Sequence, residues 1–220
     1  LTPVGKQISD TKEKERFSHP LMKAGKFIRK YNHIWTLLYI VFYMPWFVWL
    51  EKTVTKDFHL VSMPIDYKIP FCEYFIIPYF MWFLFVPAIV GYEFFYSKKE
   101  YYQCCAYLFS GMTIFLIICT IWHNGLDLRQ DISYNNNLCA KLVQMLYKTD
   151  TSTNVFPSLH VFNTLGCLVA LYRSKGVKDK TWIKVIATVI GILIILSTMF
   201  LKQHTVWDDI SAFAMAAILY

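Results

Sequence analysis

Long blocks of apolar residues constrain the fold of this chain more than any other feature of its sequence. Of its 220 residues, 56% are hydrophobic and 18% are aromatic, against roughly 45–50% apolar residues in a soluble domain. Several blocks approach the length of about 20 residues that a helix needs to cross a bilayer. The sequence therefore predicts an all-α integral membrane protein.

We expect six transmembrane helices, separated by polar segments. The predicted spans are residues 34–50, 71–96, 103–122, 155–172, 182–201 and 205–220. Together they would form a six-helix bundle, a membrane domain that covers residues 34–220. The segment between the third and fourth spans, residues 123–154, is too long to be a simple connection.

A polar and basic segment, residues 1–33, precedes the first predicted span. Between Pro20 and Tyr31, apolar residues alternate with lysine and arginine at near-helical spacing, which is typical of a helix lying in the membrane interface. A basic flank that only orients the first span explains the same pattern. We expect no cleavable signal peptide, because the polar leader is too long. The sequence stops within an apolar run at Tyr220, as a fragment of a longer product would.

The distribution of positive charge predicts the orientation in the membrane. Fifteen of the 22 lysine and arginine residues fall in residues 1–33, 98–99 and 173–184, and seven fall in the alternate segments. By the positive-inside rule the first group faces the cytoplasm. Residues 123–154 and 202–208 then face the exterior, periplasmic or luminal side. The net charge of +7 is explained by topology and anionic lipid, so we expect no nucleic-acid partner.

The six cysteines lack the paired spacing of a metal site, and we expect neither a metal nor another cofactor. Four cysteines lie in or beside predicted spans and are expected to be small core residues: Cys104, Cys105, Cys119 and Cys167. Cys72 and Cys139 are expected on the same side of the membrane, where they could pair.

Two polar clusters stand at the starts of the fourth and sixth apolar blocks. Residues 156–160 read Phe-Pro-Ser-Leu-His, and residues 203–208 read Gln-His-Thr-Val-Trp-Asp. Histidine and aspartate are costly at the mouths of membrane helices, so a functional site is the default expectation there. A histidine that only forms a polar cap at the interface is the simpler alternative.

The residue types in these clusters suit chemistry at a phosphate. Ser158 and the first-turn amides of a helix that begins near Pro157 can bind an anion. His204 and Asp208 are four residues apart, so on a helix they share one face. The acid can then fix the tautomer of the imidazole and stabilise its cation. His160 would lie in the first turn of the other helix.

Two cations predicted on the same side, Arg129 and Lys202, can supply donors to a phosphate. An ordinary loop ion pair with Asp127 or Asp131 is the alternative for Arg129. For Lys202 the alternative is a helix-end lysine that extends to the interface. Asp209 points elsewhere on the helix and is expected to be a charge near its N-terminus.

At these residues the chain resembles the type 2 phosphatidic acid phosphatase superfamily, whose pattern has three parts. The first ends in arginine-proline, and the second is proline-serine-X-histidine. The third is serine-arginine, five residues, histidine, three residues and aspartate. Residues 157–160 match the second part, and Ser197, His204 and Asp208 match the third at the family spacing.

The chain departs from the family pattern at several positions. Gln130 follows Arg129 in place of proline, and Thr198 stands in place of the arginine of the third part. Leu159 stands where the lipid phosphatases usually have glycine, and Trp122 where the first part has lysine. The Pro-Ser-Leu-His form is similar to the branch that contains inositol phosphorylceramide synthases.

The resemblance implies a six-helix membrane core and a two-step, metal-independent reaction. His204 would attack phosphorus to form a phosphohistidine, Asp208 would orient it, and His160 would protonate the leaving alkoxide. Three residues are implied to hold the phosphate oxygens: Arg129, Ser158 and Lys202.

These observations leave three functional hypotheses. The first is a membrane lipid-phosphate phosphatase, acting on a phospholipid or polyprenyl (pyro)phosphate at the non-cytoplasmic face. The second is a phospholipid head-group transferase of the inositol phosphorylceramide or sphingomyelin synthase type. The third is non-enzymatic, with His160, His204 and Asp208 binding a metal or relaying protons in a transporter.

Overall fold

The computed structural model describes residues 29–220, and the chain forms two compact units, Leu1–Leu38 and Tyr39–Tyr220. In the described part of the first unit, η1 (Asn32–Leu38) is a 3-10 helix, in which Thr36 Oγ1 donates a hydrogen bond to the carbonyl of His33. Most of the interfacial helix expected over residues 20–31 lies outside the described residues.

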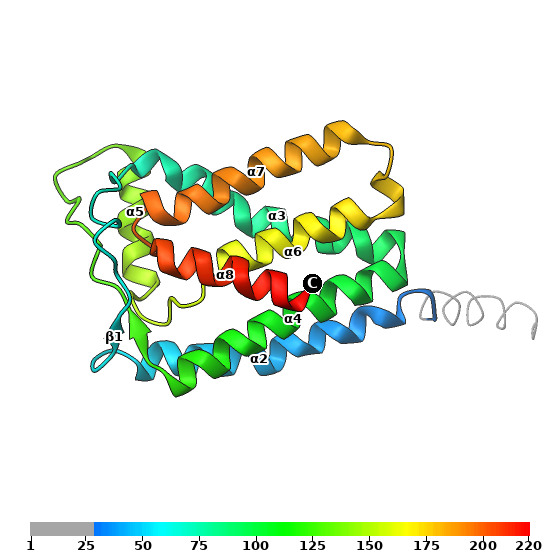
Figure 1. Cartoon of the computed structure of the whole chain (residues 1–220), viewed down its shortest axis with the longest axis horizontal. Helices are drawn as coiled ribbons and strands as arrows, with labels where there is room; N and C mark the ends of the chain where they lie inside the picture. The colour runs from blue at the N-terminus through cyan, green and yellow to red at the C-terminus, as the bar shows by residue number, and fades with distance from the viewer. Residues whose placement is uncertain (1–28) are drawn as a thin grey trace, which may run out of the picture. The chain divides into compact units, whose positions relative to one another are not determined.

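The second unit is a bundle of helices with one small sheet (Figure 1). Its α-helices are α2 (Tyr39–Thr53), α3 (Ile76–Tyr96), α4 (Lys98–Ile121), α5 (Leu138–Thr149), α6 (Leu159–Arg173), α7 (Thr181–Phe200) and α8 (Val206–Leu219). Two 3-10 turns, η2 (Glu73–Phe75) and η3 (Lys175–Val177), precede α3 and α7. The strands β1 (His59–Leu60) and β2 (Asn124–Gly125) pair in parallel. The prediction of a mainly helical protein is thus confirmed.

Among residues 29–220, four helical segments are long and apolar enough to cross a membrane. They are Asn32–Thr53, Glu73–Tyr96, Lys98–Ile121 and Thr181–Phe200. Large apolar side chains on these segments are exposed, among them Phe42 at 76%, Leu84 at 74% and Ile121 at 82%. In water such exposure would be costly, whereas lipid accommodates it.

The fourth and sixth predicted spans also form helices, but short ones. α6 has 15 residues and α8 has 14, against the roughly 20 that a straight crossing requires. The structure therefore supports four of the six predicted spans by length and composition.

α6 is the central helix of the bundle and contacts α3, α4, α7 and α8. Its close approach to α4 depends on small residues. A Cβ at Gly111 of α4 would lie 2.1 Å from the ring of Phe162, and one at Gly166 would lie 2.7 Å from the ring of Tyr107. Small residues at helix contacts are typical of membrane bundles, because they let backbones approach closely.

α5 was not expected, because residues 123–154 were predicted only as a long polar segment. Asn137 caps its N-terminus by accepting a hydrogen bond from the amide of Ala140 at 2.7 Å. Its apolar face, with Val143 and Leu146, packs against Ile76 and Tyr79 at the start of α3. The helix therefore covers one end of the bundle, where it fixes the loops around it.

The cysteines divide as the sequence predicts. Cys104, Cys105, Cys119 and Cys167 are buried in the core. Cys72 and Cys139 are partly buried and carry free thiols.

The α4–α6 contact yields a stability prediction. Gly111→Ala should lower the melting temperature in detergent, because the new methyl group overlaps the buried ring of Phe162 and overpacking costs about 1–3 kcal/mol. Gly91→Ala on α3 is the matched control, since its Cβ would meet nothing within 4 Å and alanine favours the helix. Equal melting temperatures for the two variants would contradict this account of the contact.

Candidate active site

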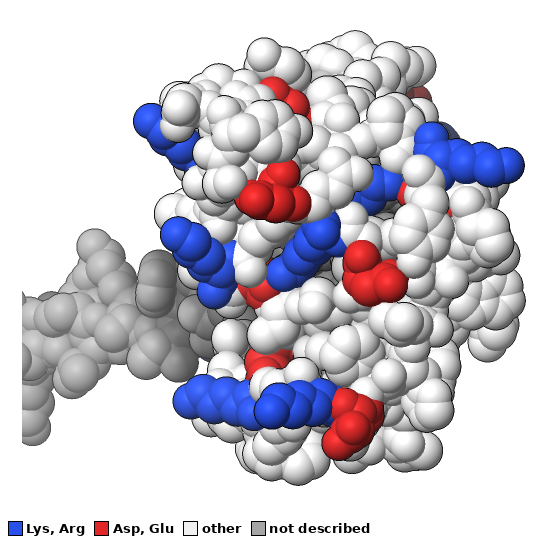
Figure 2. Space-filling model, turned by 90° about the vertical axis from the view of Figure 1, so that its left-hand side faces the viewer, with Lys and Arg blue, Asp and Glu red and all other residues white. Residues whose placement is uncertain are grey.

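Three segments that are distant in sequence meet at the end of the bundle where α5 lies (Figure 1). The amide of Ser158, just before α6, donates to the carbonyl of Asp208 in the first turn of α8 at 3.2 Å. Asn124 Oδ1 accepts from the amides of Val155 and Phe156, both at 2.9 Å. Figure 2 shows this end of the molecule, where basic and acidic side chains are interspersed.

The two motif histidines face each other at this junction. His204 Nε2 lies 3.4 Å from His160 Nδ1, and His204 Nδ1 lies 3.5 Å from Asp208 Oδ2. The structure therefore joins His160, His204 and Asp208 in one row, with Nε2 of the central imidazole turned away from the acid. This is the arrangement in which a carboxylate prepares a histidine as nucleophile or base.

The first turn of α8 fixes the position of Asp208. Thr205 Oγ1 accepts from the amide of Asp208 at 3.1 Å, and Asp208 Oδ2 accepts from the amide of Thr205 at 2.8 Å. This reciprocal capping box satisfies two free amides of the first turn of α8. Because the same Oδ2 faces His204, the start of α8 fixes the position of the acid beside the imidazole.

The electrostatic surroundings favour the protonated form of His204. Burial alone would lower the pKa of His204, but the Asp208 carboxylate and the charges of Asp209 and Asp150 outweigh it and raise that pKa. His204 is 8% exposed and Asp208 is fully buried, so water screens their attraction little. The ring can thus carry positive charge in a site that excludes most solvent.

Ser158 and Asp209 complete the immediate surroundings. Ser158 is buried and its Oγ caps α6 by accepting from the amide of Val161 at 3.4 Å. Asp209 accepts from Thr198 Oγ1 at 3.1 Å. The residue that stands in place of the family's arginine thus contacts the second aspartate of α8, without supplying a cation.

Two aromatic rings of α3 pack on His160, a contact that the sequence analysis missed. The ring centroids of Tyr79 and Trp82 lie 4.6 Å and 4.5 Å from that of His160. Trp82 Nε1 and His160 Nε2 are buried without a hydrogen-bond partner in the described part of the chain. Residues three apart share a helix face, but the sequence did not show that this face meets the site.

Arg129 lies at the same end and is bound by backbone carbonyls. Its Nη1 donates to the carbonyls of Tyr147 at 3.3 Å and Asp150 at 2.7 Å. Its Nη2 donates to the carbonyl of Thr151 at 2.7 Å and to Gln203 Oε1 at 2.8 Å. The acid nearest the guanidinium is Asp150, at 3.9 Å, and neither Asp127 nor Asp131. Arg129 therefore ties the end of α5 to the residue before His204.

The other predicted cation, Lys202, is buried and contacts a loop that the sequence analysis did not connect with the site. Its Nζ donates to the carbonyls of Asp66 at 2.6 Å and Ile69 at 2.5 Å. Burial lowers the pKa of Lys202, and the charge of Asp66 partly offsets this. Asp66 Oδ1 in turn accepts from the amide of Val206 at 2.8 Å. The 66–69 loop is thereby fixed to the start of α8.

The structure brings together His160, His204, Asp208 and Ser158, and it places the Nη groups of Arg129 and the Nζ of Lys202 on protein oxygens. Sequence reasoning missed Asp66, Tyr79, Trp82 and Asp150, and it gave no role to Gln203 within the predicted cluster 203–208. Within residues 29–220, no group of three or more histidine, cysteine, aspartate or glutamate residues is arranged to hold a metal ion.

Comparison with known families supports the resemblance. Residues 133–220 match the PAP2 superfamily, and this segment contains His160, His204 and Asp208. The resemblance to type 2 phosphatidic acid phosphatases is confirmed over that segment, and Arg129 precedes it. No curated protein and no solved structure matches the chain.

The contacts of Lys202 predict that this residue stabilises the fold of the ligand-free protein. Lys202→Met should lower the free energy of unfolding by about 3 kcal/mol, because it leaves two carbonyls without their charged donor. Lys148→Met, at an exposed position of α5, is the matched control and should leave stability unchanged. Denaturant titration of both variants in the same detergent measures the difference. If both variants match the wild type, the ammonium group does not hold the 66–69 loop.

Proposed function

We infer from the PAP2 superfamily match of residues 133–220 that the protein has activity of the phosphatase or phosphotransferase type. Within that class, the function that the site supports best is a membrane lipid-phosphate phosphatase. Its substrate would be a phospholipid or polyprenyl (pyro)phosphate, and its intermediate a phosphohistidine. The contact row Asp208–His204–His160 is the observation that carries this proposal.

In the proposed first step, His204 Nε2 attacks phosphorus and the bond to the leaving alkoxide breaks. Asp208, at 3.5 Å, retains the proton on Nδ1 and stabilises the charge that develops on the ring. His160, whose protonated form the negative charge of the bound phosphate would stabilise, donates that proton to the alkoxide and becomes neutral. The incoming phosphoryl group would separate the two imidazole rings, which contact each other directly at 3.4 Å without it.

In the second step a water molecule attacks the phosphohistidine, and His160, now neutral, accepts its proton. The P–N bond breaks, phosphate leaves, and both histidines return to their starting states. Most of the catalysis would come from positioning and charge stabilisation, which is what phosphoryl transfer requires.

We propose that three residues stabilise the bound phosphate, each in a different way: Ser158, Arg129 and Lys202. Ser158 and the first amides of α6 would contact its oxygens directly. Arg129 Nε is buried and has no partner among the described residues, so it remains available as a donor. Lys202, with its ammonium on two carbonyls, would act through its charge and by holding the loop.

We further propose that α6 and α8 complete a six-helix membrane core, with the N-terminus in the cytoplasm. The turn between α3 and α4 and the segment between α6 and α7 carry the lysines that the positive-inside rule assigns to the cytoplasm. The histidine site lies at the other ends of these helices (Figure 1), which would be the exterior, periplasmic or luminal face.

A head-group transferase is the second candidate, and the Thr198–Asp209 contact favours it. Thr198 Oγ1 donates to Asp209 at 3.1 Å, but a hydroxyl supplies no positive charge where the family has arginine. A singly charged phosphodiester needs less positive charge in its site than a doubly charged monoester does. Supplying ceramide or diacylglycerol with a labelled phospholipid separates the candidates, since a transferase gives labelled lipid and a phosphatase gives free phosphate.

A metal or proton-relay transporter is the non-enzymatic alternative, which stoichiometric zinc in the purified protein would favour.

The mechanism predicts that both histidines are essential. His204→Ala and His160→Ala should each reduce phosphate release by at least about 10³-fold, in the presence of EDTA, because each removes a group that acts on phosphorus or the leaving oxygen. His123→Ala, an exposed histidine at the same end, is the matched control and should keep full activity. Full activity in both motif variants would exclude the phosphohistidine mechanism.

The charge of Asp208 predicts a change in pH dependence. A protonated His204 cannot attack, so activity should fall as the pH drops through the raised pKa of His204. In Asp208→Asn the pKa of His204 should fall, because burial then acts with less opposing charge, and the acidic limb of kcat/KM should move to lower pH. The maximal rate should also drop, by roughly 10³-fold, because the tautomer is no longer held.

Asp131→Asn is the control for this profile, since the Asp131 carboxylate lies at the same end and only caps a loop through the amide of Ser133. It should leave both the limb and the rate unchanged. An acidic limb that stays in place in Asp208→Asn would show that the Asp208 charge does not set the titration of His204.

A further inference from the structure

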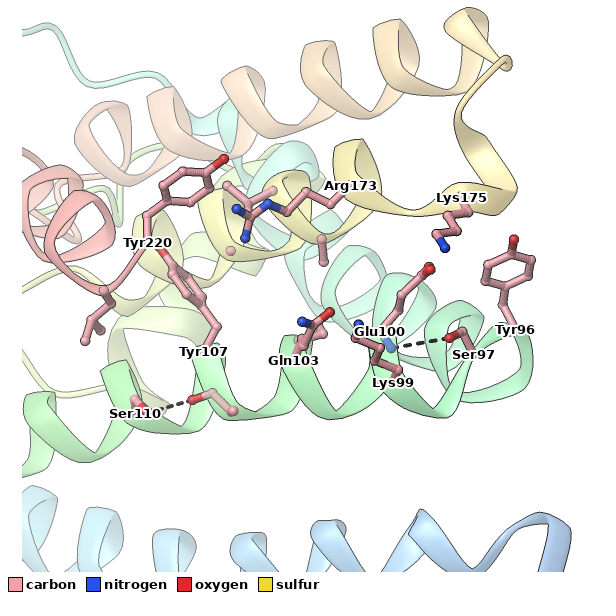
Figure 3. Close-up of a pocket in the computed structure, with 16 residues that line it drawn as sticks. Tyr96, Ser97, Lys99, Glu100, Gln103, Tyr107, Ser110, Arg173, Lys175 and Tyr220 are labelled. Atoms are coloured by element: carbon pink, nitrogen blue, oxygen red, sulfur yellow. Dashed lines mark hydrogen bonds between the residues drawn. The ribbon is translucent and has the colours of Figure 1, made fainter.

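A cavity of about 800 Å³ lies between α4 and α6, far from the histidines. Figure 3 shows its walls. α6 connects the two places, since His160 is in its first turn and Arg173 is its last residue. At 1.5 Å rise per residue, these two positions are roughly 20 Å apart along the helix axis. The cavity is therefore not part of the histidine site.

The mouth of the cavity is basic. Lys99 of α4, Arg173 of α6 and Lys175 of η3 line it, and within the described residues none of them forms an ion pair with a carboxylate. Glu100 also lines the cavity, but its carboxylate accepts a hydrogen bond from Ser174 Oγ at 2.8 Å. Three cations thus face one carboxylate that already has a partner.

Arg173 extends from the end of α6 toward Tyr220. Figure 3 shows it above Gln103 and beside Tyr220, and its guanidinium carbon lies 4.3 Å from the centroid of the Tyr220 ring. Stacking on a ring leaves the edge of a guanidinium free for hydrogen bonds. The donors of Arg173 are therefore available to an anion in the cavity.

Apart from these charged residues, the wall of the cavity is largely apolar. Ala106, Tyr107, Val169 and Leu219 line it, and Tyr107 Oη donates to the carbonyl of Ala216 of α8 at 2.8 Å. Gly166 forms part of the floor, where a Cβ would meet Tyr107 at 2.7 Å. A basic mouth that continues into an apolar groove matches a molecule with an anionic head and a hydrocarbon chain.

We propose that this cavity binds one anionic glycerophospholipid, with its phosphate among Lys99, Arg173 and Lys175 and an acyl chain along Ala106 and Val169. Basic pockets between membrane helices recognise anionic lipid head groups. The positive-inside rule places this end of the bundle at the cytoplasmic leaflet, where anionic lipids are enriched. A zwitterionic head group would bring its own cation close to the three on the protein, and a soluble phosphate would leave the apolar groove unfilled.

Native mass spectrometry of the full chain in detergent tests the proposal, with His204→Ala as the background so that lipid is not turned over. Phosphatidylglycerol should bind roughly tenfold more tightly than phosphatidylcholine with the same acyl chains. The double variant Arg173→Gln/Lys175→Gln should lose this preference. Lys178→Gln/Lys180→Gln removes equal charge from the neighbouring segment outside the cavity, and it should keep the preference.

A second pair of variants tests the groove without changing charge. Ala106→Phe should fill the groove and weaken phosphatidylglycerol binding, again roughly tenfold, whereas Ile117→Phe, an exposed position of α4 outside the cavity, should not. The proposal is overturned if the wild-type residues show no preference for phosphatidylglycerol, or if both double variants lose it equally. Displacement of the lipid by glycerol 3-phosphate alone would also overturn it, because the site would then recognise a soluble phosphate.

Discussion

The contact between the start of α6 and the first turn of α8 determines the geometry of the whole site. The amide of Ser158 donates to the carbonyl of Asp208 at 3.2 Å, and the Asp208 carboxylate caps its own helix and faces His204. One buried acid thus joins two helices and orients an imidazole. Because a buried carboxylate without partners is unstable, the helix start, the helix pair and the histidine orientation depend on one another.

The cations around this contact hold loops in place before any ligand arrives. Arg129 links the end of α5 to Gln203, and Lys202 links the 66–69 loop to the residues between α7 and α8. Backbone carbonyls at the mouth of a membrane helix need donors, and water is scarce there. A long basic side chain supplies several donors at once. The same two residues therefore hold the segments on either side of His204, and under the proposed function they would also supply positive charge near a bound phosphate.

The sequence predicts what depends on local spacing, and it misses what depends on packing between distant segments. Apolar blocks indicate most of the helices because lipid requires both apolar side chains and internal hydrogen bonds. The spacing of His204 and Asp208 predicts their pairing because residues four apart share a helix face. By contrast, nothing local indicates that Tyr79 and Trp82 pack on His160, or that Asp66 reaches Val206. The start of α5 does have a local signal in the sequence, since asparagine, here Asn137, is a typical N-cap residue.

α6 is shorter than its neighbour α4 and shorter than the hydrocarbon core of a bilayer. Under the proposed six-helix arrangement, its 15 residues extend about 22 Å, less than the roughly 30 Å of a hydrocarbon core. α4, with 24 residues, is about 36 Å long by the same rise per residue. The C-terminal end of α6 reaches the first turn of α4, since Ser174 Oγ donates to Glu100 Oε2 at 2.8 Å. The difference in length therefore falls at the other end, where His160 is recessed below the end of α4. Under that arrangement, a lipid in the leaflet at the histidine end would meet His160 near the depth of its own phosphate, which suits a ligand that approaches from within the membrane.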